Sequence, residues 1–230
     1  NTYPIGYQEI EDGDIVFELD KFQTKATPVS EDELYAITYD KIDSLNKRHK
    51  KSILARKFAK AVHALAPLEH TVNTPVIIST GGVVNGRKRA TLTDIINLRQ
   101  AFNDAKVPDD GNRVLVLSSD HLTDLLIEDK DLYKNYVNTQ TGALQPLLYG
   151  FKVFTYNEMP YFTLNTKKKT SFGAVPTSAE TAASVAFYAP DMFRATGATK
   201  MYYDKPDTQH QRQYIKTTKE NEQRNSKGNF

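Results

Sequence analysis

The stretch Ser30-EDELYAITYDKIDSLNKRHKKSILARKFAKAVHALA-Pro67 decides the fold, because it carries both a start signal and a stop signal for one long helix. Ser30 and Glu33 match a capping box, in which hydroxyl and carboxylate each accept a backbone N–H. No Gly or Pro interrupts the stretch before Pro67, which disfavours helical geometry at Ala66 and ends the hydrogen-bond ladder. The pattern predicts one helix over residues 31–66, about 54 Å long at ~1.5 Å per residue.

The apolar residues of this stretch recur at three-to-four spacing, which leaves a wide polar face. They are Ile42, Leu45, Ile53, Leu54, Phe58, Val62 and Leu65, with His49 on the same line. We therefore expect the helix to lie along a surface rather than inside a core. His49 and His63 are expected to be helix-surface residues.

Four cations occupy the middle of the helix, at Lys47, Arg48, Lys50 and Lys51. A solvated face explains such a run. Contact with an acidic partner or with a neighbouring subunit explains it as well, so both interpretations stay open.

The composition is that of an ordinary folded protein. The chain has 230 residues, of which 39% are hydrophobic and 25% charged, and this suits one or two domains. A formal net charge of +2 gives no strong attraction to nucleic acid. No cysteine occurs, which excludes disulfides, thiolate metal sites and cysteine nucleophiles. No apolar run approaches the roughly 18 residues of a membrane span, so we expect a soluble protein with no membrane partner.

Both ends of the chain look dependent on neighbours. Residues 1–29 form an extended arm, in which Ile15, Phe17 and Leu19 alternate with their neighbours as in a strand that has no evident partner. From Thr218 onward the chain is polar, and we expect this tail to be loose unless a partner orders it. Because the chain opens at Asn1 within a polar phrase, we also expect further residues upstream.

The rest of the chain mixes helices and strands, which predicts an α+β fold. Thr91 and Asp94 match a helix cap, and the segment 120–127 has an amphipathic helical pattern. The expected strands are Pro75–Ser79, Arg113–Ser118, Gly150–Thr155, Ala182–Ala189, and the pair Thr199–Tyr203 and Gln211–Thr217.

No motif predicts a catalytic residue, a cofactor site or a metal site. Gly81 and Gly86 have the spacing of a phosphate-binding loop, but Arg87 and Lys88 stand where that loop needs Lys and Ser or Thr. A surface hairpin is the simpler interpretation, and a nucleotide- or phosphate-binding enzyme that uses Gly81–Arg89 remains the alternative. The five histidines lack the spacing of metal ligands.

Four phrases, taken in order, carry a resemblance to a known family. They are Asp32-ELYAITYDK-Ile42, Arg113–Ser118 followed by Asp120-His-Leu122, Gly150-Phe-Lys-Val153, and Glu158-Met-Pro160. With the arm before them and the late apolar strand after them, they resemble the major capsid proteins of tailed bacteriophages. The resemblance spans most of the chain and rests on order and spacing, since no single phrase is specific.

The resemblance implies an HK97-like subunit with a long spine helix. It implies an E-loop-like arm over residues 1–29, a peripheral domain over 30–89 with the spine helix at 31–66, and an axial domain over 90–180. Residues 181–230 would return to the peripheral domain and end in the polar tail. The subunit interface is expected to include Ile15, Phe17 and Leu19 of the arm, and Lys47, Arg48, Lys50 and Lys51 of the helix.

The resemblance also implies a structural, non-enzymatic role. Such phage or prophage subunits assemble as hexamers and pentamers into an icosahedral shell around packaged DNA, which they contact non-specifically. A scaffolding protein and a portal are the further partners that it suggests. Assembly would take place in the bacterial host cytoplasm, and the mature protein would reside in the virion capsid. A non-viral encapsulating shell of the same fold is a further alternative.

Overall fold

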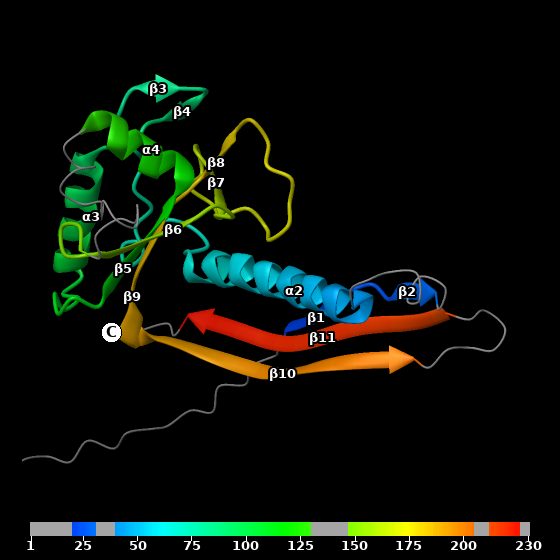
Figure 1. Cartoon of the computed structure of the whole chain (residues 1–230). Helices are drawn as coiled ribbons and strands as arrows, with labels where there is room; N and C mark the ends of the chain where they lie inside the picture. Colours follow the sequence, from blue (N-terminus) through cyan, green and yellow to red (C-terminus); the bar gives the residue numbers. More distant parts are fainter. Residues whose placement is uncertain (1–19, 31–39, 130–146, 205–211, 226–230) are drawn as a thin grey trace, which may run out of the picture.

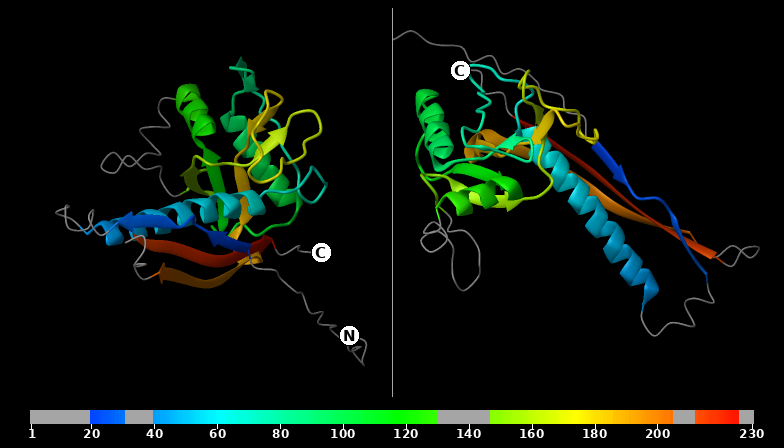
Figure 2. Two further views of the ribbon diagram at one scale, coloured as in Figure 1. Left: turned by 90° about the vertical axis from the view of Figure 1, so that its right-hand side faces the viewer. Right: turned by 90° about the horizontal axis from the view of Figure 1, so that it is seen from above.

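The computed structural model describes residues 20–30, 40–129, 147–204 and 212–225. It contains two regions, a long antiparallel sheet covered by one helix and a compact lobe at one end of that helix (Figure 1). Figure 2 shows the helix on one face of the long sheet, with the lobe beyond its C-terminal end. The mixture of helices with parallel and antiparallel strands agrees with the predicted α+β class.

The long sheet is built on β10 (Met192–Asp204) and β11 (Arg212–Asn225). These strands pair antiparallel from Met192 opposite Asn225 to Asp204 opposite Tyr214, with a register shift between Thr196 and Thr199. On its other edge β11 pairs with β1 (Asp20–Gln23) and β2 (Thr27–Ser30). At ~3.3 Å per residue, the two long strands extend over 40 Å.

Two expectations about the chain ends are therefore wrong. Residues 218–225 belong to β11 instead of forming a loose tail, and residues 20–30 pair within their own chain. A polar sequence can sustain both pairings because the backbone supplies the hydrogen bonds of a sheet. The predicted interface residues Ile15, Phe17 and Leu19 lie outside the described residues.

The helix on this sheet is α2 (Lys41–Leu65), 25 residues long. It begins later than predicted, because Asp40 has extended backbone angles (φ −67°, ψ 96°) and accepts a hydrogen bond from the Asp43 N–H. One continuous helix over residues 31–66 is therefore wrong, and residues 31–39 lie outside the described part. The predicted end is confirmed, since Ala66 is extended (φ −77°, ψ 140°) directly before Pro67.

The buried line of α2 differs from the predicted apolar stripe. His49, Ile53, Lys57 and Ala61 are buried at four-residue spacing, whereas Leu54 and Phe58 are 39% and 49% exposed. A helix resting on one sheet buries only a narrow line of positions. Leu54 and Phe58 are therefore left exposed, whereas Val62 and Leu65 are half-buried against the lobe.

The compact lobe has a small sheet with β5 (Arg113–Ser118) in its centre. This strand has the predicted bounds, and all six of its residues are buried. It runs parallel to β6 (Lys152–Tyr156) and antiparallel to β9 (Val185–Tyr188). The helices α3 (Leu92–Asp104) and α4 (Ser119–Glu128) confirm the two helices predicted there.

The lobe has two apolar clusters, one on each face of this sheet, because successive residues of a strand point to opposite faces. The cluster beneath α3 and α4 consists of Ile95, Leu115, Leu117, Leu125, Leu148, Phe151 and Val153. The other cluster, which reaches the end of α2, consists of Ala66, Val114, Val116, Met159, Phe162 and Val185. The end of α2 is thereby anchored in the core of the lobe.

Short elements complete the lobe. They are the hairpin of β3 (Val83–Val84) with β4 (Arg87–Lys88), the pair of β7 (Tyr161–Thr163) with β8 (Glu180–Ala182), and the 3-10 turn η1 (Ala189–Asp191). The predicted strand Pro75–Ser79 is wrong, since this segment is irregular. The predicted single strand Ala182–Ala189 is divided between β8 and β9.

Candidate interaction surface

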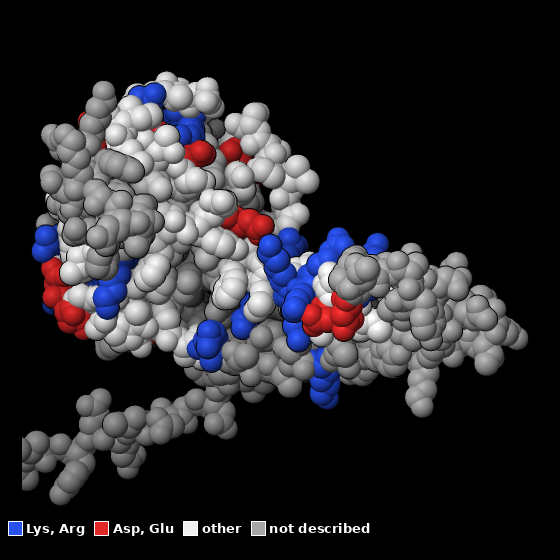
Figure 3. Space-filling model, in the orientation of Figure 1, with Lys and Arg blue, Asp and Glu red and all other residues white. Residues whose placement is uncertain are grey.

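The side of α2 that faces away from the sheet carries a line of exposed residues, which we call the outer stripe. It consists of Lys47, Lys51, Leu54 and Phe58, whose spacing of four, three and four places them on one helix face. All four are exposed. Figure 3 shows Lys and Arg side chains gathered over this part of the molecule. The stripe is basic at its start and apolar at its end.

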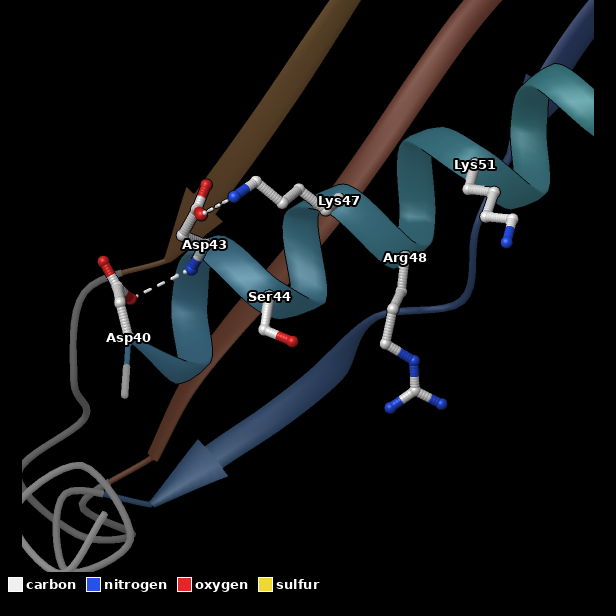
Figure 4. A pocket seen from close by; sticks show the side chains of 6 residues that line it. All are labelled: Asp40, Asp43, Ser44, Lys47, Arg48 and Lys51. Atoms are coloured by element: carbon white, nitrogen blue, oxygen red, sulfur yellow. Dashed lines mark hydrogen bonds and ion pairs between the residues drawn. The ribbon is translucent and has the colours of Figure 1, made fainter. Parts of the chain in front are cut away.

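A shallow depression lies at the basic end of the stripe (Figure 4). It is lined by Asp40, Asp43, Ser44, Lys47, Arg48 and Lys51. Lys47 pairs with Asp43 at 2.6 Å, and its hydrogen bond to Asp43 raises the pKa of Lys47. This pair is largely exposed, so it contributes little to stability and remains available for exchange with another carboxylate.

The predicted cations thus have two different settings. Lys47, Arg48 and Lys51 line the depression, whereas Lys50 is exposed and does not line it. Within the described part of the chain, Arg48, Lys50 and Lys51 form no ion pair. The sequence therefore identified the exposed cations but missed Leu54 and Phe58, whose apolar character predicted burial.

His49 belongs to the opposite side of α2, which corrects its assignment as a surface residue. It is 8% exposed, and its ring nitrogens contact the hydroxyls of Thr24 at 2.6 Å and Thr27 at 3.0 Å. A hydroxyl can donate or accept, so both nitrogens are satisfied in either tautomer. These contacts fix the segment between β1 and β2 against the sheet-facing side of α2. Asp20 extends the attachment by an ion pair with Lys60.

The segment between β7 and β8 joins α2 to the lobe. Lys169 donates hydrogen bonds to the carbonyl oxygens of His63 at 2.7 Å and Ala66 at 2.6 Å, which lack partners in the last helical turn. Burial lowers the pKa of Lys169 to about 8. Nearby, Phe172 lies 4.2 Å below the Arg56 guanidinium and edge-on to His63. This segment is therefore a structural clamp between α2 and the lobe.

The Gly81 loop is a hairpin, in agreement with the simpler of the two interpretations. Asn85 and Gly86 have φ values of 50° and 79°, as a tight hairpin turn with two left-handed residues requires. The Gly81 and Arg89 N–H groups bond within the hairpin, and Arg87 pairs with Asp124. These two backbone donors are therefore occupied by the hairpin itself and are not free to hold a phosphate.

The start of α3 is also closed to an anion. Thr91 and Asp94 form the predicted capping box, and the Leu92 N–H donates to the Glu128 carboxylate at 2.7 Å. A carboxylate already sits where a helix N-terminus would attract phosphate. This geometry does not favour a nucleotide site in this part of the lobe.

A Ser, a His and an Asp lie close together in the lobe without the arrangement of a catalytic triad. The His121 Nδ1 contacts the Ser184 hydroxyl at 2.7 Å, and that hydroxyl also accepts the Ser118 N–H at 3.0 Å. Asp124 is engaged instead by Arg87 and by the Ala90 N–H. A triad needs the carboxylate to orient the histidine, and here it neutralises an arginine.

Among the described residues, no group of three or more His, Asp or Glu side chains is placed to hold a metal ion. No helix in the described part of the chain is both long enough and apolar enough to cross a membrane.

Comparison with known proteins gives matches in structure alone. No protein-family model and no curated protein sequence matches the chain. The capsid structure of the cyanophage P-SCSP1u is similar at a TM-score of 0.60 and 14% identity, over 90% of this chain and 69% of that one. The asymmetric unit of the bacteriophage PhiM1 mature capsid gives a TM-score of 0.55 and 14% identity, over 98% and 77% of the two chains. The chain therefore has a fold like those of phage capsid structures.

Proposed function

We propose that this protein is a structural subunit of a phage capsid, without enzymatic activity. The observation that carries the proposal is the fold similarity to two phage capsid structures, which extends over at least 90% of this chain. A similarity confined to the lobe would support only a shared small domain. This one includes the long sheet and α2 as well.

In its finer form, the proposal is a major capsid protein of a tailed phage or prophage with an HK97-like arrangement. The long sheet, α2 and the arm would form the peripheral part, and residues 90–180 the axial domain. Subunits would join as pentamers and hexamers into an icosahedral shell around DNA. A scaffolding protein and a portal would be partners during assembly in the host cytoplasm. A non-viral encapsulating shell would use the same subunit geometry, and its cargo would distinguish it.

The physical character of the long-sheet region supports a geometric function. Large exposed apolar side chains on a single helix face favour association, since burying them removes apolar surface from water. Subunits held by many shared contacts gain stability from assembly rather than from each core alone. The predicted interface residues belong to this region or directly precede it.

The first test is the assembly state of the purified chain, measured by light scattering and negative-stain electron microscopy over a range of salt and protein concentrations. We expect closed shells, or rings of five and six subunits. A protein that stays monomeric under every condition would contradict the proposal. It would then direct attention to ligand screening of the hairpin at Gly81–Arg89.

A second test concerns the arm. Replacing Phe17 and Leu19 together by Asp should leave a folded monomer, because the two apolar clusters of the lobe are built from buried residues between Ala66 and Val185. The same change should block assembly if these residues lie on an adjacent subunit. Circular dichroism would monitor the fold, and electron microscopy would count particles. Normal shells from the double variant would refute the role of the arm.

A further inference from the structure

We propose that β10 pairs with β10 of a second copy of this chain, antiparallel and across a two-fold axis, so that two long sheets join into one. The pairing is centred on Tyr202, which places Lys200 of each copy opposite Asp204 of the other. The inference rests on the proposed function and adds to it a contact between two subunits, its register and its symmetry.

β10 is the outermost strand on one edge of the long sheet (Figure 1). Its 13 residues pair with β11 on one side, and among the described residues no strand pairs with its other side. The N–H and C=O groups along such an edge are a template for another strand. The edge can therefore extend the sheet without any change in the fold of the subunit.

The second half of β10 lacks the usual protection of an edge strand. Proteins prevent edges from pairing by keeping them short, or by means of proline, bulges and charge. β10 contains no proline, and its irregularity between Thr196 and Thr199 lies before the six regularly paired positions 199–204. The charged residues at these six positions are Lys200 and Asp204, which have opposite signs. The segment 199–204 can accept another strand, and its charges select which one.

Strand geometry limits the registers that two copies of β10 can adopt. Successive residues of β10 direct their backbone N–H and C=O groups alternately toward β11 and toward the free edge. Two antiparallel copies form a regular ladder only when each residue lies opposite one at an even separation in sequence. The register with Tyr202 opposite Tyr202 meets this condition at every position.

In that register β10 is complementary to itself. Lys200 lies opposite Asp204 once at each end, and Tyr202 lies opposite Tyr202 between them. These three positions alternate along the strand, so they share one face of the joined sheet. Opposite charges and aromatic pairs placed directly across two strands stabilise a sheet. Lys200 is exposed in the subunit, as such a contact requires.

A two-fold pairing also suits the proposed shell. An icosahedral shell has two-fold axes between neighbouring rings, and an interface on such an axis must be complementary to itself. The pairing of a few residues is weak in one dimer, but it is repeated over the shell, where other contacts hold the two strands close together. We therefore expect it to form on assembly rather than in dilute subunits.

Disulfide formation measures the register, since the chain contains no cysteine of its own. Tyr202→Cys places two cysteines directly opposite each other, with Cα atoms about 4.5–5.5 Å apart and within the range of a disulfide. Tyr203→Cys is the matched control, because residue 203 lies diagonal to its counterpart at about 7–8 Å. After assembly and oxidation, we expect about tenfold more dimer from Tyr202→Cys on a non-reducing gel.

A mixture of Met201→Cys chains with tagged Tyr203→Cys chains gives a second measurement. Positions 201 and 203 lie opposite each other in the proposed register, so the mixed disulfide should form although Tyr203→Cys alone gives little dimer. Well-formed shells without an excess of dimer at position 202 would overturn the pairing while the capsid function stands, and so would coverage of this edge by residues 1–19. A Tyr202→Cys dimer from chains that never form shells would support the pairing and contradict the proposed function.

Charge reversal tests the pairing without oxidation. Lys200→Asp puts carboxylates opposite each other at both ends and should lower the yield of assembled particles about fivefold or more. Adding Asp204→Lys in the same chain restores both pairs with the signs exchanged and should recover most of the yield. Lys88→Asp, the same charge change at an exposed position of the lobe, should leave the yield within about twofold. A defect in Lys200→Asp that Asp204→Lys does not relieve would refute the register.

Discussion

The lobe and the long-sheet region differ in how much apolar surface the described residues bury. The lobe encloses two apolar clusters around β5, and every residue of β5 is buried. In the long-sheet region and its helix, the described buried apolar residues are Val29, Ile53, Ala59 and Ala61, two of which are alanines. At about 25 cal/mol per Å² of apolar surface, an alanine side chain contributes little.

The difference indicates which region can stand alone. The lobe has two enclosed apolar clusters of its own, whereas the long sheet is covered by the single helix α2 (Figure 2). β10 forms one edge of that sheet, and among the described residues no further strand pairs with it, so this edge is suited to gaining a partner. This contrast is the physical basis for proposing that neighbouring copies complete the long-sheet region.

The largest effect on stability is expected from removing a buried side chain from the core of the lobe. Phe151 is fully buried and packs edge-on against Phe102, with ring centroids 5.3 Å apart. Phe151→Ala should lower the free energy of unfolding by about 3–5 kcal/mol, since it removes apolar contacts and leaves a cavity. Urea denaturation followed by circular dichroism measures this. A loss below about 1 kcal/mol would mean that the lobe is not the stable half.

The next largest effect is expected at the ion pair that ties the hairpin to α4. Asp124 is buried and accepts hydrogen bonds from Arg87 and from the Ala90 N–H. Burial raises the pKa of Asp124, but these bonds outweigh it and hold the pKa below its usual value. Asp124→Ala leaves both donors unpaired and should cost about 2–3 kcal/mol of unfolding free energy.

Asp120 provides the matched control for this pair. It faces the same Arg87 at 3.7 Å but is 62% exposed. Asp120→Ala should cost less than about 1 kcal/mol, as is typical of exposed ion pairs. Equal effects of the two substitutions, measured by thermal denaturation, would show that burial does not decide the strength of this contact.

Two adjacent residues of α2, one buried and one exposed, allow the contributions of burial and of assembly to be separated in the long-sheet region. Ile53 is 4% exposed and Leu54 is 39% exposed. Ile53→Ala should lower the unfolding free energy by about 2 kcal/mol, whereas Leu54→Ala should change it by less than about 0.5 kcal/mol. Leu54→Ala should instead weaken assembly, as measured by the critical concentration for particle formation. Loss of monomer stability from Leu54→Ala would contradict its place on the outer stripe.

The smallest expected effect is the pH response of the clamp between α2 and the lobe. Burial lowers the pKa of Lys169 to about 8, against a usual value of 10.5 in the unfolded chain. Between these two values the unfolded chain binds the extra proton, so stability should rise as pH increases from 8 toward 10. Below pH 8 both states are protonated and this contribution is flat.

The measurement is the difference in unfolding midpoint between the natural chain and Lys169→Gln at pH 7, 8, 9 and 9.5. The natural chain should gain stability relative to the variant as pH rises above 8. Using a difference removes the contribution of tyrosines that titrate at higher pH. A difference that falls with pH would mean that the Lys169 ammonium is better stabilised in the folded protein than in the unfolded chain.

The sequence predicts the lobe better than the long-sheet region, for a physical reason. In the lobe, local signals and tertiary packing agree, as in the cap formed by Thr91 and Asp94 and in the apolar strand Arg113–Ser118. In the long-sheet region, partners far apart in sequence decide the structure. The polar end of β11 pairs with residues 20–23 and 192–196, and no local signal near Thr218 predicts this.

Two predictions about α2 are wrong for local reasons: the residue at which it begins, and the burial of its whole apolar stripe. Asp40 is an N-cap residue set inside a good helical pattern, and its carboxylate competes with the helix for backbone donors. Leu54 and Phe58 are apolar and periodic, which normally indicates burial. An exposed apolar helix face has the same sequence pattern as a buried one, so sequence periodicity alone cannot distinguish the two.

The most direct test of the account is hydrogen exchange, measured by mass spectrometry on free subunits and on assembled particles. We predict that backbone amides of α2, β10 and β11 gain strong protection on assembly, while those of β5, α3 and α4 are already protected in the free subunit and change little. Uniform protection of both regions in the free subunit, unaltered by assembly, would contradict the claim that neighbouring copies complete the long-sheet region.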